Sequence, residues 1–191
     1  LAFIATIICL LIGYPLAFAI SRTKPSVQKV LVMLLMLPMW INFIIRTDSI
    51  AILIEKNGVI NQFLGLFGAH MELMDTRAAV VIGMVYDFLP YMILPIYSVL
   101  TKLDGKLIEA AHDLGCNAFQ ALTRVIIPLS VGGIVSGITM VFVPALTTFV
   151  ISDLLGGGKI LLIGNVIEQS FKQNSNWHVG SGLSMVLMVF I

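Results

Sequence analysis

Charge is scarce in this sequence. Of its 191 residues only 11% are Asp, Glu, Lys or Arg, whereas 59% are hydrophobic, and the mean hydropathy is +1.03. A soluble domain carries about a quarter charged residues. Several uncharged runs are long enough to cross a bilayer, so the composition excludes an ordinary soluble protein and indicates a membrane protein.

The sequence also lacks the residue patterns of the common catalytic and metal sites. Its 2 cysteines, Cys9 and Cys116, have no neighbours that suggest metal binding, redox chemistry or a disulfide. No nucleophile–base pair is apparent, and Gly156-Gly157-Gly158-Lys159 lacks the glycine spacing and the Ser or Thr of a P-loop. We therefore expect no enzyme activity and no cofactor bound by this chain.

Apolar runs predict the domain organisation. Spans of this length must be helices that satisfy their own backbone hydrogen bonds, and the alternating segments of roughly ten residues typical of a membrane β-barrel are absent. We expect an all-α fold, a polytopic membrane helical bundle forming a single transmembrane domain over residues 1–191. Both ends lie inside apolar runs, which predicts a fragment of a longer chain. The predicted spans are residues 1–20, 31–54, 78–100, 130–151 and 182–191, the last one truncated.

The Lys and Arg residues of the loops predict the orientation. The loops at 21–29 and 102–124 are richer in these residues than the segments at 46–77 and 152–178. Because basic loops stay in the cytoplasm, we place the first two loops there and expect extracytoplasmic loops at the other two segments.

The cytoplasmic loop at 102–128 has the most helical content outside the spans. Asp104 is a candidate N-cap for a helix over 104–114, and Gly115 stands where a left-handed C-cap favours glycine. A second helix is expected over 117–126, capped by Asn117. Spacing alone fits two roles equally, docking of the loop into a groove of another protein or packing against its own bundle.

The residues of this loop carry a resemblance. The series Glu109-Ala110-Ala111, Gly115, Phe119 and Pro128 resembles the EAA loop of the permeases of binding-protein-dependent ABC importers, type-1 transmembrane domains. In that family the loop forms a coupling helix that sits in a cleft of the cytoplasmic ATPase. The resemblance implies that Glu109, Ala110, Ala111 and Gly115 make the contact and that Phe119 and Pro128 brace the helix against the spans. Asp113, one turn after Glu109, adds charge to the same helix.

Further segments are similar to the spermidine/putrescine branch of the family, and to its first, B-type, permease subunit. They include Leu37-Pro38-Met39-Trp40-Ile41-Asn42 and Ser152-Asp153-Leu154-Leu155-Gly156-Gly157-Gly158-Lys159. The resemblance implies a polyamine permease of the bacterial cytoplasmic (inner) membrane. Its partners would be an ABC ATPase dimer that binds ATP and Mg²⁺, a second permease subunit forming a heterodimer, and an extracytoplasmic substrate-binding protein. No nucleic acid is expected.

Polar residues inside the predicted spans suggest a substrate pathway. Asp87 lies on the order of 14 Å into its span at 1.5 Å per residue, near the middle of a roughly 30 Å core. A lone carboxylate there costs at least about 2.5 kcal/mol, so it should face a cavity, a partner, or be protonated. With Tyr86, Tyr91 and the carbonyls freed by the nearby prolines it would suit a polycation. A hydrogen bond between helices or a pair with Arg46 explains it equally well.

Two more residues are candidates for the pathway. Trp40 would line it or belong to the packing of its span, and Asp153 would lie in an outer vestibule or cap the next element. Three alternatives stay open: a permease for another small solute such as an anion, iron or an amino acid; a secondary transporter or channel, which needs no docking loop; and a non-transporting assembly factor.

Overall fold

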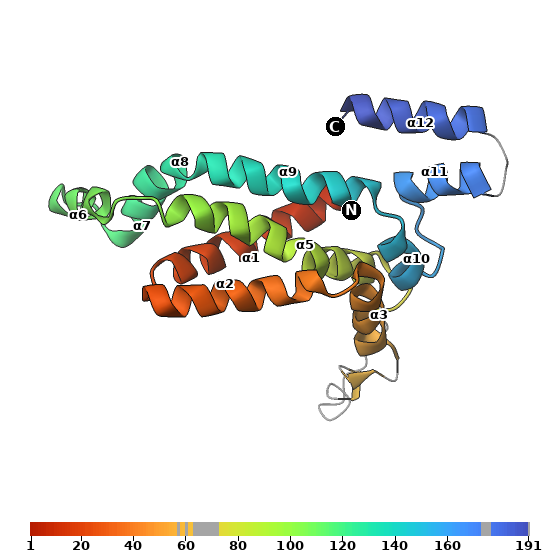
Figure 1. The fold of residues 1–191 in the computed structure, drawn as a ribbon, viewed down its shortest axis with the longest axis horizontal. Coiled ribbons are helices and arrows are strands. Elements are labelled where there is room, and N and C mark those ends of the chain that lie inside the picture. The colour runs from red at the N-terminus through yellow and green to blue at the C-terminus, as the bar shows by residue number, and fades with distance from the viewer. Residues whose placement is uncertain (57, 60, 63–72, 173–176, 191) are drawn as a thin grey trace. The chain divides into compact units, whose positions relative to one another are not determined.

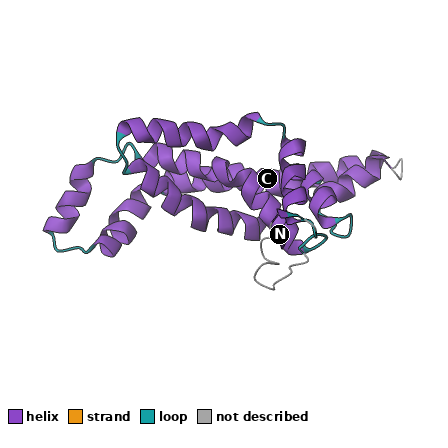
Figure 2. Cartoon of the chain, turned by 90° about the horizontal axis from the view of Figure 1, so that it is seen from below, coloured by secondary structure: helices purple, strands orange, loops and turns teal. Residues whose placement is uncertain are grey.

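The computed structural model describes residues 1–191 apart from 57, 60, 63–72, 173–176 and 191. The described residues form helices and contain no strand (Figure 2), which confirms the all-α prediction. They group into two compact units. The first unit comprises Leu1–Thr6, Ile41–Asp87 and Phe142–Ile191, and the second comprises Ile7–Trp40 and Phe88–Val141.

Four apolar helices run side by side in the second unit (Figure 1). They are α1 (Ala2–Ser21) from Ile7 onward, α2 (Pro25–Trp40), the second half of α5 (Arg77–Leu100) and the first part of α9 (Val131–Thr147). The centre is α5, whose buried side chains include Met92 and Ile96. Side chains of α1 and α9 pack on both sides of it.

Glycine allows the close approach of α9 to α5. A Cβ added at Gly133 would lie 3.0 Å from the Pro95 carbonyl oxygen, and one added at Gly137 would lie 2.8 Å from the Met92 sulfur. Small residues let membrane helices approach until their backbones touch, and dispersion contacts then replace the hydrophobic driving force that lipid does not supply.

The end of the second unit that carries the loop at 102–128 has three shorter elements. They are α6 (Gly105–Asp113), α7 (Ala118–Ala121) and α8 (Ile127–Leu129), and a π-helical turn, η1, covers Leu122–Ile126. The helix α6 lies beyond the end of α5 in this unit (Figure 1).

The first unit is built from α3, α10, α11 and α12 with the first half of α5 and the end of α9. Their bounds are Phe43–Ile54, Val150–Gly156, Ile163–Lys172 and Trp177–Phe190. The helices α11 and α12 lie against each other, where Gly180 faces the Phe171 ring and Trp177 stacks edge-on at 5.4 Å between ring centroids. Buried Met84, Ile151 and Leu155 form the core of this unit.

The helix bounds show that some of the predicted spans contain a helix break, while the spans themselves stay predictions. Among the described residues α1 and α5 are each long and apolar enough to cross a membrane. The range 31–54 was expected as one span with a polar notch at Arg46-Thr47-Asp48 near its far end. It contains the end of α2 and all of α3, which are separated at Ile41-Asn42. The reason is local: Asn42 is extended and its Oδ1 accepts from the Ile44 N–H at 2.9 Å, which starts a new helix.

A similar helix break lies within the predicted span 130–151. The helix α9 ends at Thr147, and α10 begins at Val150. The segment 152–178, expected as a loop, contains most of α10 and all of α11. Two broken pairs, α2 with α3 and 118–129 with α9, reach the length and apolarity of a span when each pair is taken together. The single transmembrane domain stays a prediction, and most of the predicted loop at 55–77 lies outside the described residues.

Candidate functional site

The helix α6 is fixed at both ends by its own loop residues. The Asp104 carboxylate accepts from the Lys106 N–H at 3.0 Å, so the predicted N-cap is confirmed. At the other end Gly115 has φ +84°, and the Cys116 N–H donates to the Ala111 carbonyl at 3.0 Å. This is the Schellman arrangement that a glycine C-cap makes possible. The two caps give a nine-residue helix defined ends without support from a neighbouring span.

The second half of the loop is capped in the same way. Asn117 and Gln120 form a capping box, with the Gln120 N–H donating to Asn117 Oδ1 at 2.8 Å and the Asn117 N–H to Gln120 Oε1 at 3.0 Å. The helix then widens into η1, where the Ile127 N–H bonds to the Leu122 carbonyl. Pro128 follows at once, and it offers no N–H to the regular ladder. Sequence reasoning missed this π-turn, since no residue pattern announces one.

The predicted coupling residues are mostly exposed. Glu109, Ala110, Asp113, Gly115 and Pro128 are exposed, and Ala111 alone is buried, at 6%. Phe119, expected to brace the loop, is 72% exposed. The carboxylates of Glu109 and Asp113 therefore stand one turn apart on a solvent-facing surface, beside the small side chain of Ala110.

A groove runs beneath this loop. It has a volume of about 500 Å³ and lies between the end of α1, α6 and the α7–η1 segment. Its lining residues are Phe18, Arg22, Ile108, Ala118, Phe119, Ala121, Leu122 and Ile126. The exposed Phe119 ring forms one wall, so its apolar surface is available for contact.

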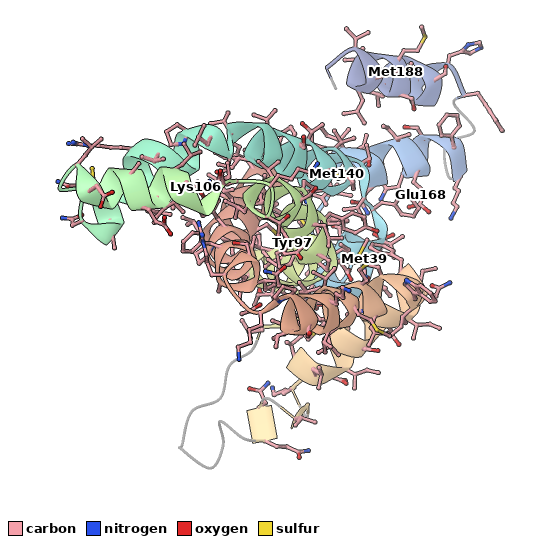
Figure 3. The ribbon with its side chains drawn as sticks, turned by 60° about the vertical axis from the view of Figure 1, so that its left-hand side comes forward. Met39, Tyr97, Lys106, Met140, Glu168 and Met188 are labelled. Atoms are coloured by element: carbon pink, nitrogen blue, oxygen red, sulfur yellow. The ribbon has the colours of Figure 1, made fainter. Side chains whose placement is uncertain are left out.

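Two hydrogen bonds join helices of the second unit and show at which end of the unit the loop lies. The Tyr97 hydroxyl donates to Gln28 Oε1 at 3.3 Å, joining the end of α5 to the start of α2. The Tyr14 and Ser130 hydroxyls are 2.9 Å apart and join α1 to the start of α9. The α1–α2 turn and the α5–α6 turn therefore lie at the same end of this unit, as the distribution of Lys and Arg predicted. Figure 3 shows Tyr97 within the helices and Lys106 on the α6 side.

Asp87 is fully buried in the first unit. Its Oδ1 accepts from Arg46 Nε at 2.5 Å, its Oδ2 accepts from the Thr47 hydroxyl at 2.8 Å, and Arg46 also donates to the Asp87 carbonyl at 3.2 Å. Both carboxylate oxygens are thus engaged by α3. This geometry favours the pair with Arg46 over a carboxylate that waits for a cation. Thr47, which the sequence left inside a polar notch, supplies the second contact.

The aromatic candidates are divided between the units, with Tyr86 in the first and Trp40 and Tyr91 in the second. Tyr86 is 42% exposed and Trp40 is 85% exposed, while Tyr91 packs edge-on against Phe88 with 6.4 Å between ring centroids. The described residues contain no group of three His, Cys, Asp or Glu side chains that could hold a metal ion.

Asp153 belongs to a small polar pocket of about 290 Å³ with Asn165, Glu168, Gln169 and Lys172. Its Oδ1 accepts from Asn165 Nδ2 at 2.6 Å, and Glu168 accepts from Lys172 Nζ at 2.6 Å. Partial burial raises the pKa of the Asp153 carboxyl above its usual range, the Glu168 charge raises it further, and the Asn165 hydrogen bond lowers it. The pocket therefore holds two carboxylates and one ammonium, and the ammonium is bonded to Glu168.

Comparison with known proteins identifies the family of this chain and several similar proteins. A family model described as the binding-protein-dependent transport system inner membrane component matches residues 9–191. The chain is 47% identical over 191 residues to the spermidine/putrescine transport system permease protein PotB of Haemophilus influenzae, covering 98% of this chain and 67% of that protein.

Two proteins of Escherichia coli are also similar. The spermidine/putrescine transport system permease protein PotB is 42% identical over 192 residues, covering 99% of this chain and 70% of that protein. The inner membrane ABC transporter permease protein YdcU is 26% identical over 206 residues, covering 100% and 66%. The similarity therefore extends over both units and the loop between α5 and α9.

Proposed function

Because the chain belongs to the family of binding-protein-dependent transport system inner membrane components, we propose that it is the permease subunit that carries spermidine and putrescine through an ATP-driven importer. The observation that carries the substrate is the 47% identity over 98% of the chain to a spermidine/putrescine permease. ATP is hydrolysed by a separate ATPase dimer. A second permease subunit completes the pathway, and an extracytoplasmic binding protein delivers the polyamine.

The ATPase dimer docks on α6. The support is geometric: α6 is capped at both ends, so it moves as a rigid piece, and its exposed face combines Glu109 and Asp113 with the small Ala110. A small residue allows close approach of a partner backbone, while the two carboxylates offer charge-assisted hydrogen bonds. Phe119 and the groove beneath the loop provide the apolar part of the contact. Gly115 and Pro128 hold the ends of the segment.

Site-directed crosslinking tests this docking in the full-length complex. With Cys9 and Cys116 replaced by serine, Ala110→Cys should crosslink to the ATPase, and the bond should block polyamine uptake. Ala78→Cys, equally exposed but at the start of α5, is the matched control and should not react with the ATPase. Crosslinking of both positions, or of neither, would remove α6 from the interface.

Competition for uptake tests the substrate. Cells that depend on this transporter should take up labelled spermidine, and unlabelled putrescine should compete with it. Phosphate, ferric iron and amino acids should not. Inhibition by one of those solutes instead would assign the permease to it, and uptake that persists without the ATPase would make it a secondary transporter.

Two predicted pathway residues receive separate roles in this proposal. Asp153, with Tyr86, contributes to the outer part of the pathway, where its carboxylate meets a primary ammonium of the polyamine. Asp153→Asn should raise the KM for spermidine with little change in the maximal rate, whereas Asp48→Asn, an exposed carboxylate of the same unit, should change neither. Asp87 instead holds α3 to α5, so Asp87→Asn should leave the uptake KM unchanged. Tyr91 acts through its packing on Phe88.

A further inference from the structure

One face of α2 carries a groove that nothing else in the second unit fills. Its volume is about 400 Å³. The lining includes Lys29, Val32, Met33, Met36 and Trp40 of α2 with Tyr97 of α5. The α2 positions repeat every three or four residues, so they form one stripe along the helix.

The stripe changes in character from one end to the other. Lys29 is exposed at the start of α2, and among the described residues no carboxylate pairs with it. Met33 is 65% exposed in the middle, and Trp40 is 85% exposed at the far end. A cation therefore lies at one end of a mainly apolar groove whose flexible methionine side chains adapt to the shape of an occupant.

The length of the stripe equals the depth of one leaflet. Lys29 and Trp40 are 11 positions apart, which at 1.5 Å per residue is about 16 Å along the helix. Half of a hydrocarbon core of roughly 30 Å is about 15 Å. With Lys29 at the membrane surface, Trp40 lies near the bilayer centre.

The headgroup end of the groove is on the side of the coupling helix. The hydrogen bond between Tyr97 and Gln28 brings the start of α2 beside the end of α5, which leads into α6. That side is the cytoplasmic one according to its Lys and Arg residues. The cytoplasmic leaflet carries anionic lipids, and each basic residue at its surface adds to their attraction.

We propose that this groove binds one anionic phospholipid of the cytoplasmic leaflet, with its phosphate on Lys29 and an acyl chain along Met33 and Met36 to Trp40. Tyr97, which lines the groove, is in the last turn of α5, so the bound lipid lies against the end of the helix that leads into the coupling helix. The ligand is additional to the polyamine and takes no part in recognising it.

Quenching of tryptophan fluorescence by brominated lipids tests the site directly. The full-length transporter complex is placed in nanodiscs that contain brominated phosphatidylglycerol in plain phosphatidylcholine, or the reverse mixture. The Trp40 signal is the difference between the complex and its Trp40→Phe variant. We expect phosphatidylglycerol to be favoured by about fivefold at Trp40 in the unaltered complex.

Two lysine variants separate a built site from general surface charge. Lys29→Gln should remove the preference and leave equal quenching by both lipids. Lys24→Gln, which alters the turn before α2 but not the groove, should keep it. Equal loss in both variants, or equal quenching by both lipids in the unaltered complex, would overturn the proposal.

Absence of any quenching at Trp40 would also overturn it, because protein or water then covers the groove. That result would fit Trp40 on the substrate pathway or against the second permease. The measurement uses neither polyamine nor ATP, so its failure leaves the proposed transport function untouched and is not caused by it.

Discussion

Arg46 Nε donates to the Asp87 carboxylate at 2.5 Å, although the two residues are 41 positions apart in the chain. Arg46 is 5% exposed and Asp87 is 0% exposed, so the two charges are buried as a pair. The pair joins α3 to the first half of α5. A buried charge is tolerated when its partner and its hydrogen bonds are complete, and here Thr47 completes the set.

Removal of one partner should therefore be costly. Asp87→Ala leaves the Arg46 charge buried without compensation and should lower the free energy of unfolding by about 3–5 kcal/mol. Thermal unfolding in detergent measures it. The control is Lys159→Ala, which breaks an exposed pair with Asp75 and should cost no more than about 1 kcal/mol. Equal effects of the two substitutions would show that the buried pair contributes nothing special.

The left-handed residue after α6 predicts a substitution effect. Gly115 has φ +84° and a Cβ there meets no atom, so Gly115→Ala is opposed by backbone conformation alone, by about 1–2 kcal/mol. We expect frayed α6 amides in hydrogen exchange and more ATP hydrolysed per polyamine transported. Gly105→Ala is the matched control, because a Cβ there also meets open space, at the start of the same helix. It should leave the coupling of ATP hydrolysis to transport unchanged and the exchange of α6 amides unchanged or slower. Fraying of α6 in both variants would refute the C-cap role.

The packing of α9 on α5 predicts different effects for substitutions at two neighbouring glycines. Gly133→Ala places a methyl group 3.0 Å from the Pro95 carbonyl oxygen and from a Val99 methyl, so α9 must move away from α5. We expect a loss of about 1–3 kcal/mol in unfolding free energy, the usual range for overpacking. Gly132→Ala, one residue earlier and facing open space, should be neutral or slightly stabilising. If Gly132→Ala were as harmful, the loss would come from the helix backbone rather than from this contact.

The pocket around Asp153 predicts a pH dependence of stability. Burial and the Glu168 charge raise the pKa of Asp153 in the folded chain, so ionisation of Asp153 opposes folding. Its favourable contribution is complete below the usual aspartate pKa and is lost as pH rises through the folded value. Asp153→Asn should therefore raise the melting temperature at pH 7 relative to the unaltered protein, and the gap should close toward pH 4.

Glu168→Gln is the control for that experiment. It removes the like charge beside Asp153. In a protein that already carries Glu168→Gln, adding Asp153→Asn should therefore raise the melting temperature at pH 7 by less than it does in the unaltered protein. A gap that is the same at both pH values would contradict the assigned cause.

The sequence predicted the short-range features of the loop well. Asp104, Gly115 and Asn117 occupy their caps because a cap depends only on residues within one turn, and their chemistry is visible in the printed sequence. The π-turn at Leu122–Ile126 was missed because it depends on how the ladder adjusts before Pro128.

Long-range contacts were less accessible. The notch at 46–48 was interpreted as the far end of a span, yet Arg46 and Thr47 are buried because their partner is Asp87 on another helix. The helix break lies at Asn42 instead, where a single asparagine cap outweighs an apolar run that looked continuous. Likewise, Phe119 was expected to brace the coupling helix against the spans, yet its ring is 72% exposed, and the contacts of a side chain with distant helices cannot be predicted from its spacing in the sequence.

We propose that this chain passes polyamines through the inner membrane under the control of an ATPase docked on α6. The direct measurement is uptake of labelled spermidine by proteoliposomes that contain the full-length complex and binding protein, with ATP inside or absent. We expect spermidine uptake only when ATP is present, and we expect this uptake to stop when the Ala110→Cys crosslink to the ATPase is closed. Uptake that proceeds without ATP, or that continues unchanged with the crosslink closed, would contradict it.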